Sequence, residues 1–359
     1  MKLRVIKAGN VSPLYSQAIY HGIAEQMRVD DEPVLVILQP TKPYICIGLH
    51  QHLEAEVDID FCKENNIPVL RRHVGGGTVL LDENQVFFQY IFPKAKAPNQ
   101  AKLLYPFLLQ PVLQTYQHFG IAASLKSLND IQANNQKIGG TGAGTINNAT
   151  VLVGSFLYDF AYRLMSQCIK SPSESFARGL ETLLKQQITT INSLLPGPPS
   201  VVELINIYLK NIPDSLNVDI EESTLTTRET DAIYEAEEDL MDEEWLKIDG
   251  KKLVSNGLKI AAGIYLLEQT LPFCGSPLNI RIKFEEKAIH TTWLKSEKPA
   301  LQESLNTICK SMNIIKPSVA YDDIHEITLK AVSQLNVFSV TEIENLARAI
   351  FELADFSEY

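Results

Sequence analysis

Residues 71–82 read RRHVGGGTVLLD, and no other stretch limits the fold of this chain as strongly. Three consecutive glycines separate two apolar runs that have the character of strands, although glycine is depleted in strands. No Lys-Ser/Thr follows, so the stretch is not a P-loop, and it lacks the G-x-G-x-x-G spacing of a dinucleotide-binding fold. It offers backbone that a ligand can approach closely, with N–H groups free to donate to an anion. Arg71 and Arg72 face opposite ways on a strand, so one at most shares such a pocket.

A second glycine-rich segment, KIGGTG, covers residues 137–142. A lysine followed by small residues lets an ammonium group reach a phosphate or a carboxylate while the backbone leaves room. Alone the pattern is weak, because a lysine in a polar loop is usually solvated and a glycine cluster more often marks a turn than a site. We expect residues 129–133 and 150–158 to form a hairpin, with this segment in its loop.

The remaining pattern predicts an α+β protein with two domains, 1–245 and 246–359. Ser12 and Pro13 have the character of the cap and first residue of a helix. Strands are expected at 34–38, 44–47, 68–71, 78–81 and 86–92, and helices at 103–119 and 229–244. The second of these helices contains nine carboxylates and no cation. Further strands at 258–265, 279–284 and 288–294 are expected to precede helices at 298–312, 323–334 and 340–354.

Composition restricts the class of function. A hydrophobic content of 45% and a charged content of 21% are typical of a globular protein, and a net charge of -11 argues against a nucleic-acid partner. The sequence shows no secretory signal and no apolar run of about 18 residues, so we expect a cytoplasmic protein without a membrane partner. Five cysteines lie far apart without a C-x-x-C, which predicts buried thiols rather than a disulfide framework or a zinc site.

Taken together, the two glycine-rich segments resemble the lipoate-protein ligase A family of the biotin/lipoate protein ligase superfamily. The resemblance rests on the order and spacing of Arg71-Arg72-x-x-Gly75-Gly76-Gly77-x-Val79-x-x-Asp82, Asn129-Asp130, Lys137-x-x-Gly140 and Gly154-Ser155-Phe156-Leu157. It implies a catalytic domain with a mixed or antiparallel sheet, followed by a small α+β accessory domain. It also implies an ATP-dependent ligase that converts lipoate to lipoyl-AMP and transfers the lipoyl group to a lysine of a lipoyl-carrier protein. Such a carrier is a 2-oxoacid dehydrogenase E2 subunit, a glycine cleavage H protein or a similar domain.

The resemblance also assigns roles to residues. Lys137 matches the catalytic lysine, placed between the acyl carbonyl and the α-phosphate, and an ammonium there would stabilise developing negative charge. Arg72 matches an arginine near the phosphate, and Asp130 matches a residue at the nucleotide that could bind Mg²⁺. The other substrate- and nucleotide-binding positions implied are Gly75, Gly76, Gly77, Thr78, Val79, Asp82, Asn129, Gly140, Gly154 and Ser155.

The chain departs from the family pattern at several positions, among them Asn84 and Gln85, where the family usually has Gly-Asn. Leu81 and Val153 stand where the family commonly has histidines, and Gly139 and Gly142 replace a serine and an alanine. A more apolar pocket would suit octanoate as well as lipoate. Related octanoyl and lipoyl transferases form a thioester on a cysteine, and residues 120–137 contain none. Two alternatives to the ligase stay open: a transferase that uses preformed acyl-AMP, and a non-catalytic homologue that binds a carrier or a partner subunit.

Overall fold

The computed structural model describes residues 1–126, 128–171, 173–250, 254, 256–261, 263–285, 288–332 and 337–355. The chain forms two compact units. Unit 1 consists of Met1–Lys170 and Glu181–Lys252, and unit 2 consists of Ser171–Leu180 and Leu253–Tyr359. The domain division at residue 246 stays a prediction.

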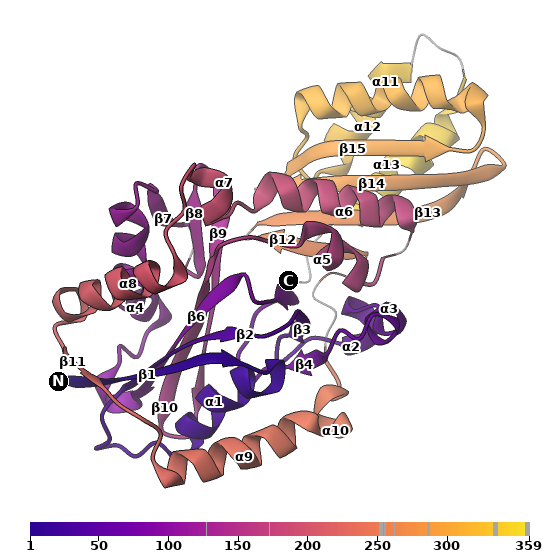
Figure 1. The fold of residues 1–359 in the computed structure, drawn as a ribbon. Helices are drawn as coiled ribbons and strands as arrows, with labels where there is room; N and C mark the ends of the chain where they lie inside the picture. Colours follow the sequence, from indigo (N-terminus) through magenta and orange to yellow (C-terminus); the bar gives the residue numbers. More distant parts are fainter. Residues whose placement is uncertain are drawn as a thin grey trace. The chain divides into compact units, whose positions relative to one another are not determined.

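Unit 1 is built on a sheet whose strands lie in the order β11-β1-β2-β6-β10-β9-β8-β7 (Figure 1). The strand β1 is parallel to β2 and β11, and the other neighbours are antiparallel. The predicted α+β fold with a mixed sheet is therefore confirmed. The strands are β1 (Lys2–Val11), β2 (Val34–Pro40), β6 (Gln85–Pro93), β7 (Ala123–Lys126), β8 (Asp130–Ala133), β9 (Gln136–Ile146), β10 (Ala149–Leu157) and β11 (Asp219–Glu222).

A smaller sheet carries the three-glycine segment. Its strands β3 (Tyr44–Ile47), β4 (Val69–Arg71) and β5 (Val79–Leu81) lie in the order β4-β3-β5. Because β4 and β5 flank β3 on opposite sides, residues 72–78 must pass across the end of β3 to connect them. The glycines thus belong to a crossing connection, which answers why the chain places them between two strands.

Helices cover both faces of the large sheet, and the alternation along β6 shows why. Phe88 and Tyr90 pack with α4 and α8, whereas Phe87 and Ile91 pack with α1 and α9. The side chain of Ser12 accepts a hydrogen bond from the N–H of Tyr15 at 3.1 Å and caps α1, as predicted. The helices of unit 1 are α1 (Pro13–Gln26), α2 (Leu53–Glu56), α3 (Ile59–Glu64), α4 (Ala101–His118), α5 (Tyr162–Cys168), α7 (Ile191–Leu194), α8 (Val201–Leu216), α9 (Thr227–Met241) and α10 (Glu243–Leu246), with a 3₁₀ turn at Lys94–Lys96. The helix α6 (Glu174–Gln187) begins in unit 2 and ends in unit 1.

The predicted hairpin of residues 129–133 and 150–158 is wrong. The segment placed in its loop is the strand β9, which pairs with β8 on one side and β10 on the other. Two ladders of backbone hydrogen bonds outweigh the low strand propensity of its glycines, because that propensity depends strongly on context. Lys137 therefore lies on a central strand.

Unit 2 contains an antiparallel sheet in the order β12-β13-β14-β15, with a core formed against three helices. The single strand expected at 258–265 includes parts of two strands, β12 and β13. Residues 333–334 of an expected helix lie outside the described residues. The elements are β12 (Gly257–Ala261), β13 (Ile264–Phe273), β14 (Ser276–Glu285), β15 (Ala288–Ser296), α11 (Pro299–Ile315), α12 (Tyr321–Val332) and α13 (Val340–Ala354).

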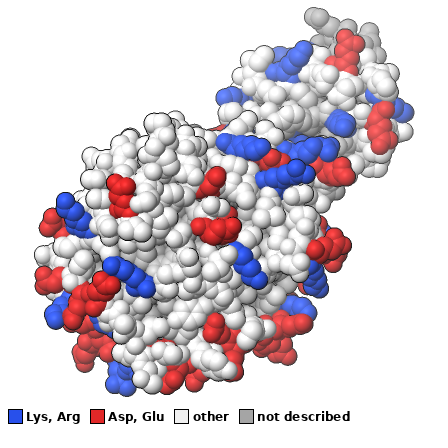
Figure 2. Space-filling view, in the orientation of Figure 1, with Lys and Arg blue, Asp and Glu red and all other residues white. Residues whose placement is uncertain are grey.

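The surface of unit 1 carries charges of both signs. On the face shown in Figure 2, Lys and Arg side chains are interspersed with those of Asp and Glu. The predicted acidic helix is present as α9 and α10, with Ile233, Ala236 and Leu240 buried and its carboxylates mostly exposed. Among the described residues, no helix combines the length and the apolar character needed to cross a bilayer.

Candidate active site

Arg72 holds the three-glycine connection in place. Its guanidinium, in a residue only 8% exposed, donates to the carbonyls of Gly75 at 3.0 Å, Gly77 at 2.7 Å and Cys46 at 2.9 Å. Gly76 has a φ of +107°, and a Cβ at that residue would lie 2.8 Å from Nη2 of Arg72. The connection therefore needs a glycine at residue 76 both for its backbone conformation and for room beside the guanidinium. Since these donors are used on backbone carbonyls, binding a phosphate would require Arg72 to exchange at least one of them.

Arg71 has a structural role, as the alternation along the strand suggested for one of the two arginines. It is fully buried, and burial lowers the pKa of its guanidinium. Its donors bind the carbonyls of five residues: Gly48, Leu49, Gln51, Leu246 and Ile248. These bonds tie the end of β4 to two other segments of unit 1.

The fold brings the two glycine-rich segments into contact. A Cβ at Gly142 would lie 3.4 Å from the carbonyl oxygen of Gly75 and 3.4 Å from Cγ2 of Val74. The three-glycine connection thus covers one face of β9. At Gly75 and Gly77 an added Cβ would meet no atom within 4 Å. Bare backbone therefore faces open space beside β9, as a site for an extended acyl ligand requires.

Lys137 lies at the start of this same strand and is fixed by an ion pair. Its Nζ is 2.7 Å from Oδ1 of Asp130, with side chains 24% and 3% exposed, respectively. A Cβ at Gly140 would lie 3.0 Å from Cε and 3.1 Å from Nζ of Lys137, so the glycine leaves the room that the lysine occupies. The carbonyl of Lys137 accepts a hydrogen bond from the N–H of Thr189 at 2.9 Å. The ammonium group is therefore held in position by its surroundings.

Asn129 is joined to β9 next to this pair. Its carbonyl accepts from Oγ1 of Thr141 at 2.8 Å, and its Nδ2 donates to the carbonyl of Thr141 at 3.4 Å. Asn129 and Asp130 thus adjoin the strand that carries Lys137, and the structure places these three predicted residues together.

Other predicted residues hold the surrounding structure. Asp82 accepts from the N–H of Asn84 at 3.0 Å and caps a turn, and burial raises the pKa of its carboxyl. Ser155 donates to Oε1 of Gln85 at 3.0 Å inside the sheet. A Cβ at Gly154 would lie 2.6 Å from Cζ of Phe88, so this glycine permits close packing.

Thr78 and Val79 lie where the connection joins β5. Val79 pairs with Cys46 in the small sheet, and Thr78 donates to Oε1 of Gln51 at 3.2 Å. Gln51 also accepts from the N–H of Gly48 at 2.8 Å and is almost fully buried. Nothing in the sequence around Gln51 indicated this role, because the partners lie on segments that only the fold brings together.

A stack of three rings was also not predicted. The ring centroids of His21 and His73 are 3.5 Å apart, and those of His73 and Trp245 are 4.1 Å apart. The indole N–H of Trp245 donates to the carbonyl of Arg71 at 3.0 Å. Residues of α1 and α10 thereby support the segment that leads into the glycines.

The described residues give limited support for the predicted Mg²⁺ site. Among them, no group of three or more His, Cys, Asp or Glu side chains is arranged to hold a metal ion. The carboxylate assigned to Mg²⁺, that of Asp130, is already paired with Lys137. In this arrangement the carboxylate of Asp130 does not fit a Mg²⁺ ligand.

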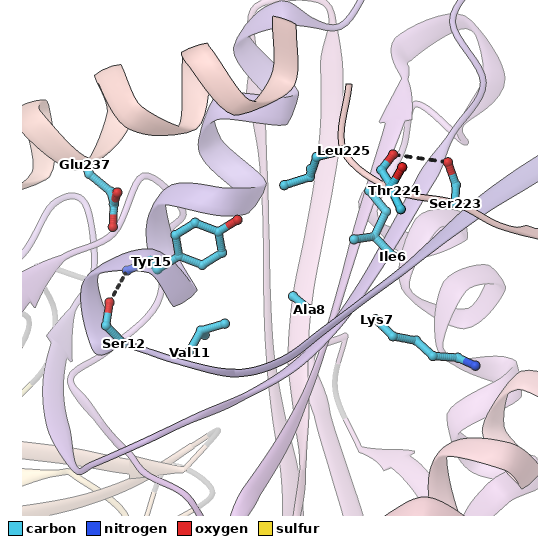
Figure 3. A pocket seen from close by; sticks show the side chains of 10 residues that line it. All are labelled: Ile6, Lys7, Ala8, Val11, Ser12, Tyr15, Ser223, Thr224, Leu225 and Glu237. Carbon is cyan, nitrogen blue, oxygen red and sulfur yellow. Dashed lines mark hydrogen bonds between the residues drawn. The ribbon is translucent and has the colours of Figure 1, made fainter. Parts of the chain in front are cut away.

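A cavity of about 650 Å³ lies elsewhere in unit 1. It is bounded by β1, the start of α1, residues 223–225 and Glu237 of α9 (Figure 3). It shares no lining residue with the predicted site, so its size has no bearing on the acyl pocket.

The fold is that of a lipoate protein ligase catalytic domain. Residues 12–212 match the family described as "Lipoyl protein ligase A/B catalytic domain", and the chain belongs to that family. The family resemblance found in the sequence is therefore confirmed.

The chain is similar to both ligases and transferases. Lipoate-protein ligase A subunit 1 of Thermoplasma acidophilum is 24% identical over 229 residues, covering 61% of this chain and 84% of that protein. Octanoyltransferase LipM of Staphylococcus epidermidis is 21% identical over 267 residues, covering 67% of this chain and 96% of that protein. The solved structure of a bi-partite lipoate protein ligase from T. acidophilum, described together with its E2 lipoyl domain, has a TM-score of 0.65 at 22% identity over 71% of this chain and 100% of that chain. This last likeness shows a shared fold.

Proposed function

We propose that the protein is a lipoate-protein ligase that activates lipoate with ATP and transfers the lipoyl group to a lysine of a lipoyl-carrier domain. The observation that carries the proposal is the position of the Lys137 side chain. It lies against Gly140 on β9, its ammonium group is paired with Asp130, and the same strand contacts the backbone of Gly75. A fixed ammonium beside bare backbone suits a ligand that combines an extended acyl chain with a phosphate. The Thermoplasma relative named above, a ligase studied with its lipoyl domain, supports the same reading.

Lys137 would act in both half-reactions. When bound, ATP supplies the adenylyl group that activates the carboxylate of lipoate. As a carboxylate oxygen attacks the α-phosphorus, the bond to the β-phosphate breaks and pyrophosphate leaves; negative charge grows on the phosphoryl oxygens, and the ammonium of Lys137 stabilises it. When the carrier lysine attacks the acyl carbonyl, charge grows on the carbonyl oxygen and AMP leaves. The same ammonium can stabilise that charge without moving far, because the two oxygens belong to adjoining groups.

The backbone around Lys137 supplies further donors and room. The N–H groups of residues 75–77 are candidates to donate to the phosphate, since no side chain at Gly75 or Gly77 covers them. Arg72 would add a donor by releasing one of its carbonyls.

A transferase that uses preformed acyl-AMP is the second candidate. It is favoured by the similarity to octanoyltransferases and by the two aliphatic residues Leu81 and Val153, which pack against the apolar core of the sheet. A thioester mechanism is less well supported, because none of the five cysteines lies on β8, β9 or β10.

Mass spectrometry of a carrier domain distinguishes these candidates. With lipoate, ATP and enzyme, the ligase produces a carrier that is heavier by one lipoyl group, whereas the transferase requires synthetic lipoyl-AMP or octanoyl-AMP. If no carrier gains mass under either condition while ATP or lipoate still raises the melting temperature, the protein is a non-catalytic homologue and the proposal is wrong.

Matched alanine variants test the site itself. Gly75→Ala and Gly77→Ala are expected to leave the melting temperature unchanged, because open space surrounds both Cβ positions, and to raise KM for ATP or lipoate. Gly197→Ala is the control, since its Cβ position is equally open and lies in a distant turn. Equal KM values for all three variants would show that no substrate lies against the three-glycine connection.

A further inference from the structure

Two cysteines that are far apart in the sequence meet inside unit 1. Cys62 lies in α3 and Cys168 is the last residue of α5, and they are 1% and 0% exposed, respectively. The two thiols lie close enough for each to shift the pKa of the other. Their sequence pattern gave no sign of such a pair, and the proposed ligase reaction uses neither residue.

Backbone bonds hold the two residues in register. The N–H of Asp58 donates to the carbonyl of Cys168 at 2.8 Å, and the N–H of Lys170 donates to the carbonyl of Glu56 at 3.0 Å. Val57 and Ile169 form an antiparallel bridge between these bonds. Cys62 lies four residues after Asp58, and one helical turn places it above Asp58, opposite Cys168. The contact between the thiols is thus built into the pairing of two chain segments.

The two thiols differ in acidity. The hydrogen bond from Cys168 lowers the pKa of the Cys62 thiol, whereas the same hydrogen bond and burial raise the pKa of the Cys168 thiol. Cys62 is therefore the nucleophile of the pair, because the thiolate is the reactive form of cysteine. Cys168 stands beside it as the resolving thiol.

We propose that Cys62 and Cys168 are a reversible oxidation site at which a peroxide converts the two thiols into an intramolecular disulfide. The thiolate of Cys62 attacks one oxygen of hydrogen peroxide, the O–O bond breaks, and a sulfenic acid and one water form. The sulfur of Cys168 then attacks the sulfenic sulfur, the S–S bond forms, and the hydroxyl group leaves as a second water with the proton of Cys168. Two thiols are oxidised by two electrons, and one peroxide is reduced to two waters.

The disulfide would join α3 to the end of α5, two residues before the chain leaves unit 1 at Lys170. Because the backbones that carry the two cysteines are already paired, little movement is needed to reach disulfide geometry. Burial slows the access of peroxide to the thiols and therefore the rate of oxidation. It does not destabilise the disulfide, because the residues that surround the thiols also surround the disulfide. The closed loop runs from residue 62 to residue 168 and includes both glycine-rich segments.

The test treats the folded, reduced full chain with hydrogen peroxide and follows intact mass and peptide maps over time. The expected product has lost two hydrogen atoms, contains a peptide linking Cys62 to Cys168, leaves three of the five cysteines free to react with an alkylating agent after unfolding, and reverts with dithiothreitol. The melting temperature of unit 1 is expected to rise by about 10 °C, because a long loop is closed in the unfolded chain.

Three variants identify the pair. Cys62→Ser and Cys168→Ser are each expected to abolish the loss of two hydrogen atoms. Cys46→Ala is the matched control, because Cys46 is equally buried and its thiol faces a carbonyl, that of Ile47. Oxidation that stops at sulfinic acid, a disulfide that involves Cys274 or Cys309, or a disulfide that forms only after unfolding would each overturn the proposal.

Discussion

The ion pair between Lys137 and Asp130 predicts an asymmetric effect on stability. Lys137→Ala removes the ammonium group from beside a carboxylate that is 3% exposed, and removing one partner of a largely buried ion pair costs roughly 3 kcal/mol. Asp130→Asn leaves an ammonium whose side chain is 24% exposed, so water can replace the lost partner and the cost is about 1 kcal/mol. The double variant removes both charges. It is expected to lose about 2 kcal/mol, half the sum of the two single costs.

Urea unfolding measures these three costs. The two tryptophans lie in different units, so a Trp293→Phe background leaves Trp245 as the fluorescent reporter of unit 1. With an m-value of about 3 kcal/mol/M, the midpoint for Lys137→Ala should fall by about 1 M and that of the double variant by less. Costs that add within about 0.5 kcal/mol, or a larger cost for Asp130→Asn than for Lys137→Ala, would refute the argument.

The same variants separate stability from catalysis. The double variant regains part of the stability lost in Lys137→Ala, yet it still lacks the ammonium group. Both are therefore expected to leave the carrier unmodified in the mass assay. Activity in the double variant would show that Lys137 supports the fold and is not needed for the reaction.

Three further predictions concern the support of the site. Burial lowers the pKa of His21 to about 4 and that of His73 to about 3, so the unfolded chain binds protons that the folded chain does not. The contribution of these two groups to the free energy of unfolding should be constant above pH 6.5 and fall from pH 6.5 toward pH 4, by up to about 3 kcal/mol per pH unit. Urea denaturation of the double variant His21→Phe/His73→Phe should show a smaller decrease over the same pH range. Gly22→Ala places a Cβ 2.6 Å from the backbone of α9, so it should destabilise unit 1 by about 2 kcal/mol in the same urea assay, and an unchanged midpoint would contradict the tight packing. Gly48→Ala places a Cβ 2.0 Å from the carbonyl oxygen of Gly76, so it should lower the melting temperature and raise KM for ATP or lipoate. An unchanged KM would show that the three-glycine connection adapts freely to the added Cβ.

Local chemistry made some elements predictable from the sequence. Ser12 and Pro13 set the start of α1 through a cap and a fixed φ, and both act within one turn. The buried positions of α9 follow a helical period, which the spacing of the apolar residues alone reveals. The strand β6 was predicted because its aromatic and β-branched residues favour strands on either face.

The glycines of β9 show where such reasoning fails. Their conformation is set by the backbones of β8 and β10, which the sequence pattern predicts to pair with each other as the two strands of the hairpin. The spacing of Lys137 and Gly140 nevertheless identified the right segment. The contact between the lysine side chain and the glycine involves only these two residues, so it can be inferred from the local sequence. The ion pair to Asp130, the role of Gln51 and the ring stack required the fold, since each joins segments that no local pattern connects.

The bonds of Arg71 have a consequence for the order in which the protein matures on the ribosome. Its guanidinium binds the carbonyl of Leu246, which is 175 positions later in the chain, and Trp245 binds the carbonyl of Arg71. At 5–20 residues per second, synthesis of that stretch takes roughly 10–35 s. The bonds between Arg71 and residues 245–248 can form only after this interval, when the acidic helix has emerged. A fragment that ends at residue 212, where the family match ends, would therefore contain every predicted binding residue and still lack these bonds at the end of β4.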